Sequence, residues 1–129
     1  MNGKFLLDTN IVIALFAGDM SIQKRLAQVE EVFVPSIVIG ELYFGAYKSK
    51  RIAENLARIE EFAVSSSVLG CGADTAREYG LIKNGLREKG LPIPENDIWI
   101  AAIAQQHDLV LVTRDEHFNK VEGLEREIW

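Results

Sequence analysis

Four acidic residues are the strongest candidates for chemistry in this chain: Asp8, Glu41, Asp97 and Asp115. Asp8 and Asp115 each follow a short apolar segment typical of a buried strand, at residues 4–7 and 109–112. Because sites in open parallel sheets form beyond the carboxyl ends of the strands, this shared placement indicates a site. Taken singly, either acid would fit a helix cap or a turn residue equally well.

Glu41 is the most informative of the four because its expected helix offers it no charge partner. The residues three and four positions away are apolar or glycine: Ile37, Val38, Phe44 and Gly45. A buried carboxylate without a partner is costly, so we expect Glu41 to need a cation or a hydrogen-bond donor. The alternative is a longer-range ion pair with Lys48 or Arg51.

Asp97 follows a loop that contains Pro92 and Pro94 and comes just before an apolar segment. An Asn or Asp in this position is a typical helix N-cap, so Asn96-Asp97 is expected to open a helix. The helix dipole would keep the carboxylate ionised, which also suits a metal ligand. Alone Asp97 is interpreted as a cap, and together with the other three acids as a ligand.

A cluster of these four carboxylates would require positive charge. Two carboxylates ~4 Å apart repel by about 4 kcal/mol at an effective dielectric near 20. Several such pairs persist near neutral pH only with a cation or by protonation. Oxygen ligands select hard ions, so the pattern predicts Mg²⁺, with Mn²⁺ as a substitute, and chemistry on phosphates.

The two histidines provide the main alternative chemistry. His117 lies two residues after Asp115, from where it could approach the acids, whereas His107 follows an apolar helix and is interpreted as a cap. A metal-free ribonuclease with two catalytic histidines would leave Glu41 without a role.

The elements that must position these residues alternate between strands and helices along the chain. We expect short strands at residues 4–8, 32–34, 64–69, 109–112 and 125–129. Helices are expected at residues 10–17, 21–29, 36–47, 51–62, 76–89 and 96–106, with Ser36 as an N-cap and Gly90 as a stop. Alternating strands and helices predict an α/β fold with a parallel sheet covered on both faces.

Size and composition fit one cytoplasmic domain. The 129 residues match the common size of a single domain, and a hydrophobic content of 48% supports a globular core. The N-terminus does not have the pattern of a signal peptide, and no apolar segment approaches the ~18 residues of a membrane span. The single cysteine, Cys71, has no partner for an internal disulfide.

The net charge of −5 is unusual for a nucleic-acid binder, because phosphate contacts need cations. Without the four candidate acids the net charge is −1. Bound divalent ions would neutralise those acids, so the remaining surface is close to neutral. Net charge therefore argues neither for nor against binding to nucleic acid.

The four acids and the residues around them resemble the PIN-domain nucleases, most closely the VapC-type toxins of toxin–antitoxin pairs. The resemblance lies in Leu6-Leu7-Asp8-Thr9-Asn10-Ile11, Val34-Pro35-Ser36 with Glu41-Leu42, Pro94-Glu95-Asn96-Asp97-Ile98, and Leu111-Val112-Thr113-Arg114-Asp115 with His117-Phe118. Each motif alone is weak, but all four occur in order and the likeness covers nearly the whole chain.

The resemblance implies a single PIN domain over residues 1–129, a three-layer α/β/α sandwich whose short, mostly parallel sheet has the strand order 3-2-1-4-5. It implies metal-dependent hydrolysis of RNA by one or two ions, with Asp8 and Asp97 as main ligands and Glu41 and Asp115 completing the set. Three neighbouring polar residues are expected to orient the ligands: Thr9, Asn10 and Thr113.

The resemblance also implies homodimers and inhibition by a small antitoxin protein. Tyr43 and Tyr47, with Phe44, Ile39 and the apolar helix at residues 10–17, are expected to form the surface that such a partner covers. The alternative is that these aromatic residues belong to the core or to a homodimer contact.

Other functions remain open from sequence. A PIN nuclease used in RNA processing would share the same site. A non-enzymatic, Mg²⁺-binding receiver-like module would need a lysine after a late strand, where this chain has Thr113-Arg114-Asp115. Phosphatases of the haloacid dehalogenase type have Asp-x-Asp after the first strand, whereas this chain has Asp8-Thr9-Asn10.

Overall fold

The computed structural model describes residues 4–129. The expectation about a signal peptide concerns the N-terminus, whose first three residues lie outside this range. The elements in chain order are β1 (Lys4–Leu7), α1 (Thr9–Phe16), α2 (Met20–Gln28), β2 (Glu31–Pro35), α3 (Ser36–Tyr47), α4 (Ile52–Ser65), β3 (Ser67–Leu69), α5 (Ala73–Lys89), α6 (Glu95–Gln106), β4 (Val110–Val112), the 3-10 helix η1 (Glu116–Lys120) and β5 (Arg126–Glu127). Within residues 4–129, no helix is long and apolar enough to cross a membrane.

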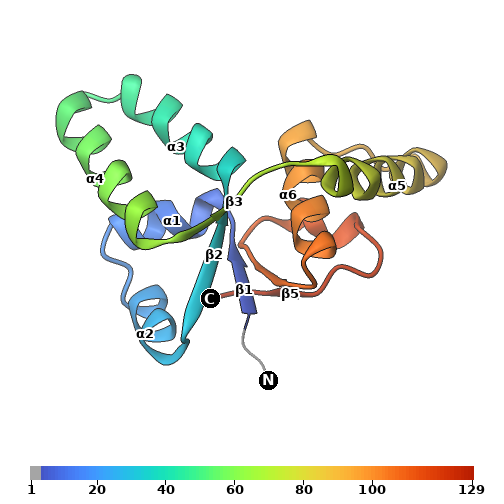
Figure 1. Ribbon diagram of the computed structural model, residues 1–129, viewed down its shortest axis with the longest axis horizontal. Coiled ribbons are helices and arrows are strands. Elements are labelled where there is room, and N and C mark those ends of the chain that lie inside the picture. The colour runs from blue at the N-terminus through green and yellow to red at the C-terminus, as the bar shows by residue number, and fades with distance from the viewer. Residues whose placement is uncertain (1–3) are drawn as a thin grey trace.

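The five strands form one sheet in the order β3-β2-β1-β4-β5, and all four pairings are parallel. This confirms the strand order expected from the sequence. Figure 1 shows α1, α2 and α4 on one side of the sheet and α5 and α6 on the other. Parallel strands run in the same direction, so the residues that follow β1 and β4 meet at one edge of the sheet.

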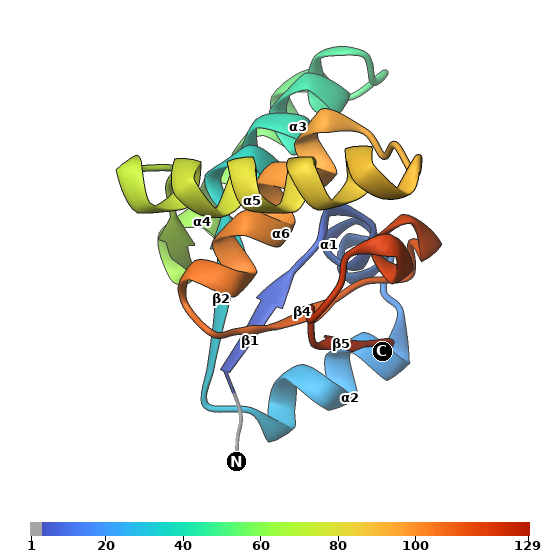
Figure 2. The ribbon, with the colours of Figure 1, turned by 90° about the vertical axis from the view of Figure 1, so that its right-hand side faces the viewer.

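The two central strands are buried on both faces. Leu6 and Leu7 of β1 and Leu111 and Val112 of β4 have no exposed surface. Helix α6 is also apolar nearly all round, because it packs between the sheet and α5 (Figure 2). These buried elements form a rigid base for the polar residues at their ends.

Two helices have a different N-cap from the one that the sequence predicted. Ser36 is the first residue of α3 rather than its cap, and α6 begins at Glu95, so Asp97 lies within the first turn and is not its N-cap. In each case a proline, Pro35 or Pro94, occupies the cap position, with a φ of −66° or −57° that leads directly into a helix. The Asp97 carboxylate is therefore free of a capping role.

Helix α5 ends at Gly90, as predicted, and this stop directs the chain towards α6. Gly90 has a φ of +66°, in the left-handed region that favours glycine. The backbone N–H of Leu91 donates to the Leu86 carbonyl at 3.0 Å, which closes the end of the helix. The proline-containing loop then places the first turn of α6, with Asp97, at the sheet edge.

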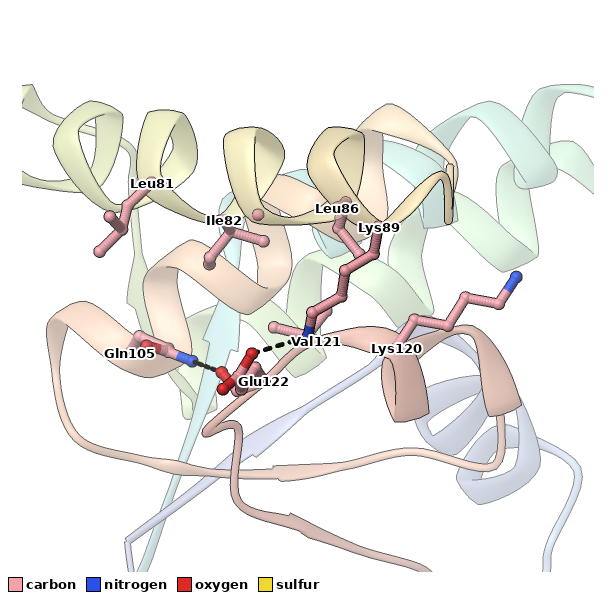
Figure 3. A pocket seen from close by; sticks show the side chains of 9 residues that line it. Leu81, Ile82, Leu86, Lys89, Gln105, Lys120, Val121 and Glu122 are labelled. Carbon is pink, nitrogen blue, oxygen red and sulfur yellow. Dashed lines mark hydrogen bonds and ion pairs between the residues drawn. The ribbon is translucent and has the colours of Figure 1, made fainter.

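The chain after η1 is held against α5 and α6. Lys89 Nζ lies 2.6 Å from Glu122 Oε2, and the Gln105 side-chain amide donates to the Glu122 carbonyl at 3.3 Å (Figure 3). Beside these contacts lies a cavity of about 240 Å³, lined partly by Ile82 and Val121. The cavity contains none of the four acids, so its contacts serve to anchor the segment that follows η1.

Candidate active site

Asp8 is the buried centre of the site. It follows β1, caps α1 and is only 4% exposed. Its Oδ1 accepts the backbone N–H of Thr9 at 2.8 Å, and its Oδ2 accepts the Thr113 hydroxyl at 2.7 Å and the Asn10 amide at 3.3 Å. The interpretation of Asp8 as a helix cap is therefore confirmed.

The environment of Asp8 raises its pKa from 3.8 to about 6. Burial is the largest cause, and the hydrogen bonds from Thr113 and Thr9 lower the pKa again in part. Repulsion from Asp97 and Glu41 raises it further, which places these carboxylates within electrostatic reach of Asp8. A nearby cation would reverse this shift.

Glu41 lies in the middle of α3 and is half-buried rather than buried, and it has a hydrogen-bond donor, one of the two partners expected for it. Its Oε1 accepts the Thr9 hydroxyl at 2.7 Å. The proposed ion pairs are absent within residues 4–129, because the Lys48 ammonium lies over the Phe44 ring and Arg51 pairs with Glu54. The hydrogen-bond donor, Thr9, lies on α1. It could not be inferred from the neighbours of Glu41 along α3.

Asp97 and Asp115 approach each other from α6 and from the segment after β4. Burial raises the pKa of Asp97, and repulsion from Asp115 and Glu41 adds to this, while a hydrogen bond with His117 lowers it. Asp115 caps η1, since its Oδ1 accepts the backbone N–H of His117 at 2.9 Å. Among residues 4–129, no lysine or arginine forms an ion pair with any of the four acids.

His117 lies between two of the acids, a closer place than the sequence suggested. Its Nδ1 is 3.2 Å from Asp97 Oδ2 and 3.1 Å from Asp115 Oδ1. Asp115 caps a 3-10 turn, and this turn brings His117 back beside Asp115. The spacing of two residues between them is the sequence feature that pointed to this contact. His107 caps the far end of α6, about 15 Å from Asp97 along the helix axis, so the two histidines do not meet.

The three neighbouring polar residues connect the ends of β1 and β4. The Thr113 hydroxyl donates to Asp8 and accepts the backbone N–H of Asp115 at 3.0 Å. Asn10 Oδ1 accepts the backbone N–H of Arg114 at 3.2 Å, while its amide donates to Asp8. Together with Thr9 they fix the direction of two carboxylates, so the geometry of the site does not depend on a bound ligand alone.

The donor set suits a divalent cation. Oxygens of Asp97 and Asp115 and a nitrogen of His117 lie within 4.8 Å of one another, and Asp8 and Glu41 are close enough to raise the pKa of a neighbouring acid. Within residues 4–129 these carboxylates have no lysine or arginine partner, and carboxylates that repel one another provide a strong local field for a cation. The residues present therefore fit a metal-dependent site.

Comparison with known proteins identifies the family. The PIN domain model matches residues 5–124. The chain belongs to the PIN-domain family. The resemblance inferred from the four sequence segments is thus confirmed, together with the sheet order that it implied.

Full-length relatives of this PIN domain carry VapC names. Ribonuclease VapC2 of Haemophilus influenzae is 39% identical, and the tRNA(fMet)-specific endonuclease VapC of Shigella flexneri is 36% identical; in both, the match covers 98% of each chain. Among solved structures, DNA-bound VapBC from Salmonella typhimurium matches with a TM-score of 0.92 and 32% identity over 99% of each chain. VapBC2 from Rickettsia felis, bound to a promoter DNA fragment, matches with a TM-score of 0.90 and 30% identity over 98% of each chain.

Proposed function

We propose that this PIN domain is a divalent-metal-dependent endoribonuclease that acts as the toxin of a type II toxin–antitoxin pair. The observation that supports the proposal is the acidic cluster of Asp97 and Asp115 beside His117, with Asp8 and Glu41 within electrostatic reach of Asp97. Among residues 4–129, none of these acids pairs with a lysine or arginine. The relatives named as ribonucleases support RNA as the substrate. The VapBC complexes among the structural neighbours support an antitoxin partner.

In this proposal Asp8 and Asp97 are the main ligands of Mg²⁺ or Mn²⁺, and Glu41 and Asp115 complete the set directly or through water. When bound, the ion activates water for in-line attack on the phosphodiester and offsets charge on the leaving oxygen. The acids come from the end of β1, from α3, from α6 and from the segment after β4, so the fold itself sets their spacing.

The surrounding residues hold the carboxylates in place for this reaction. Thr113 and Asn10 donate to Asp8 Oδ2, and the Thr9 N–H donates to Oδ1, which fixes the plane of the carboxylate. Thr9 also fixes Glu41 through its hydroxyl, so one residue orients two acids. Pre-set ligands reduce the entropy that ion and substrate binding must overcome.

The test is cleavage of RNA by the purified protein and by Asp97→Asn. We expect cleavage in Mg²⁺ or Mn²⁺, none in chelator, and a loss of about a hundredfold or more in Asp97→Asn, because a ligand matters at least as much as the residues behind it. The matched control is Asp74→Asn, on exposed α5, where the carboxylate pairs only with Arg77. Water attack gives 5′-phosphate and 3′-hydroxyl ends.

Several outcomes would contradict this function. Full activity of Asp97→Asn, or cleavage in chelator that leaves 2′,3′-cyclic phosphate ends, would favour a metal-free mechanism. Stable phosphorylation of the protein by a small phosphodonor with Mg²⁺ would instead favour a receiver-like or phosphatase-like module.

For the antitoxin we propose the groove between α1, α3 and α4. Its cavity of about 310 Å³ is lined mainly by apolar residues, among them Ile13 and Phe16, and Glu41 lies at its border. Phe44 and Tyr47 are 65% and 62% exposed nearby. An amphipathic helix that covers this groove would lie beside the acidic site, where an arginine from the partner could pair with the carboxylates.

Part of the partner surface expected from sequence belongs to the core instead. Tyr43 and Ile39 are half-buried and pack against core residues, whereas Tyr47 points outward. The alternative interpretation of these aromatic residues as core therefore holds for Tyr43. The groove between the three helices replaces the tyrosine pair as the centre of the proposed contact.

A further inference from the structure

We propose that His117 is a direct metal ligand through Nδ1, and that it makes the site prefer first-row transition metals such as Mn²⁺ over Mg²⁺. This inference rests on the proposed metal-dependent function. It extends that function by adding a nitrogen ligand to a site proposed to have carboxylate ligands alone. It starts from the cluster of Asp97, Asp115 and His117, whose ligand atoms lie within 4.8 Å of one another.

The distances around Nδ1 match an octahedral ion. Two ligand atoms that lie about 2.1 Å from an ion and at right angles to each other are about 3.0 Å apart. His117 Nδ1 lies 3.2 Å from Asp97 Oδ2 and 3.1 Å from Asp115 Oδ1. Two of the three edges thus match an octahedral face, and the ligand atoms of all three residues lie within 4.8 Å of one another.

The bonding capacity of the imidazole favours a cation between the three groups. Nδ1 carries either one hydrogen or one lone pair, so it cannot donate a well-aligned hydrogen bond to both carboxylates. A neutral nitrogen with its lone pair towards two carboxylates would be repelled by them. An ion between the three atoms turns both contacts into attraction.

Asp115 is arranged to serve the same ion. Its Oδ1 accepts the backbone N–H of His117 at 2.9 Å, which holds the two side chains in a fixed relation. A carboxylate oxygen has a second lone pair, so this hydrogen bond leaves Oδ1 free to coordinate. Backbone hydrogen bonds of this kind orient metal ligands and raise affinity.

A nitrogen ligand changes which metal is favoured. Mg²⁺ takes oxygen ligands and keeps several waters, whereas imidazole suits transition metals, whose affinity rises from Mn²⁺ to Fe²⁺ and Co²⁺. His117 should therefore strengthen binding of Mn²⁺ more than binding of Mg²⁺. Within this mixed site the four acids provide the charge, and His117 provides the selectivity.

Pulsed EPR of the Mn²⁺-loaded protein tests the inference, because a coordinated imidazole couples its nitrogen nucleus to the Mn²⁺ electron spin. The chain has only two histidines, so labelling histidine with ¹⁵N assigns any coupling. We expect nitrogen coupling in the wild type and in the control His107→Ala, since His107 is exposed at the far end of α6. The coupling should vanish in His117→Ala.

Calorimetry with Mn²⁺ and Mg²⁺ provides the second measurement. We expect His117→Ala to weaken Mn²⁺ binding by about tenfold or more and Mg²⁺ binding by less. His117→Gln can still hydrogen-bond both carboxylates but coordinates through oxygen. It should recover Mg²⁺ binding without recovering the preference for Mn²⁺, which a purely structural role would not predict.

The outcomes separate this inference from the proposed function. Mn²⁺ that binds to the wild type and is lost in Asp97→Asn, but shows no histidine coupling, would overturn the His117 ligand and leave the acidic site intact. Equal loss of Mn²⁺ and Mg²⁺ affinity in His117→Ala would overturn the selectivity. Mn²⁺ that does not bind at all would overturn both proposals.

Discussion

Asp8 shows how one side chain can serve the fold and the site with opposite effects on stability. Its carboxylate caps α1 and accepts three hydrogen bonds, which stabilise the fold. Its burial and the neighbouring acids oppose its negative charge, which raises its pKa to about 6. Without a cation, the charge that suits metal binding is therefore a cost to the folded state.

Replacing Asp8 by Asn should stabilise the metal-free protein near neutral pH. The folded protein keeps a proton on Asp8 up to about pH 6, whereas the unfolded chain releases it near 3.8. The free energy of unfolding therefore falls as the pH rises from 4 to 6, by about 3 kcal/mol from this group. Asn removes this loss but weakens one hydrogen bond by ~1 kcal/mol, so a gain of about 1–2 kcal/mol remains at pH 7.5.

Urea denaturation in chelator, at pH 4.5 and pH 7.5, measures this difference between Asp8→Asn and the wild type. The gain should be present at pH 7.5 and absent at pH 4.5. With saturating Mn²⁺ the order should reverse, because only the wild type gains from binding. A variant that is less stable than the wild type at pH 7.5 in chelator would show that the cap outweighs the buried charge.

The sequence was sufficient to propose which acids form the site, but not to predict which hydrogen bonds hold each of them. Glu41 finds its hydrogen-bond donor, Thr9, on a different helix, and such a contact has no signature in the spacing along α3. Asp97 was expected to be a cap because Asn-Asp before an apolar segment is a good start signal. Pro94 is an equally good signal for the start of a helix, and it lies three residues before Asp97. His117 depended on a 3-10 turn that residue types alone do not specify.

At the scale of elements, the turn between α5 and α6 controls where Asp97 lies. Helix α5 ends where Gly90 adopts a φ of +66°, and the next residues lead into the first turn of α6. A residue with a Cβ at this position is strained by about 1–2 kcal/mol. The end of α5 is therefore a point where a small change in sequence should have a measurable effect.

Two alanine substitutions in α5 should have opposite effects on stability. Gly90→Ala should lower the free energy of unfolding by about 1 kcal/mol because of its left-handed backbone. Gly85 has a helical backbone and no atom within 4 Å of an added Cβ, so Gly85→Ala should raise it by about 0.5–1 kcal/mol. Chemical denaturation of both variants measures the two changes in the free energy of unfolding. If both changes have the same sign and size, backbone conformation does not determine the effect of alanine at these positions.

Local sequence patterns predicted the strands and helices, but they did not always predict where these elements end. Every expected element is present, and the predicted strand at residues 64–69 is shorter because α4 continues to Ser65. Val64 is a β-branched residue that favours strands, but it follows three turns of an established helix, and extending a helix costs less than starting a strand. Element type therefore followed from pattern, while the ends were decided by neighbouring elements.

At the scale of the whole molecule, the exposed groove predicts how a partner binds. Ile13 lines the groove between α1, α3 and α4 and is 55% exposed, so a charge there should leave the fold intact. We expect Ile13→Arg to weaken binding of a co-expressed antitoxin at least tenfold, because a charge in an apolar contact is costly to bury. Leu81→Arg, at a position on α5 that is 68% exposed, should have no effect.

Pull-down, followed by a titration of the purified protein with the co-expressed antitoxin, measures both variants. If Leu81→Arg weakens the complex and Ile13→Arg does not, the partner covers the face of α5 instead. If no complex forms with the wild type, the toxin–antitoxin pairing is wrong, and an RNA-processing nuclease becomes the better interpretation of the same site.

The hydrogen bond from Thr113 to Asp8 joins residues 105 positions apart, and this separation sets an order of events during translation. Helices α1, α3 and α4, which form the groove, leave the ribosome well before α6, β4 and η1. Because local contacts form faster than long-range ones, contacts among these three helices can form before the acidic cluster exists. A partner that binds the groove could therefore meet the nascent chain first, so that the nuclease site is assembled already under inhibition.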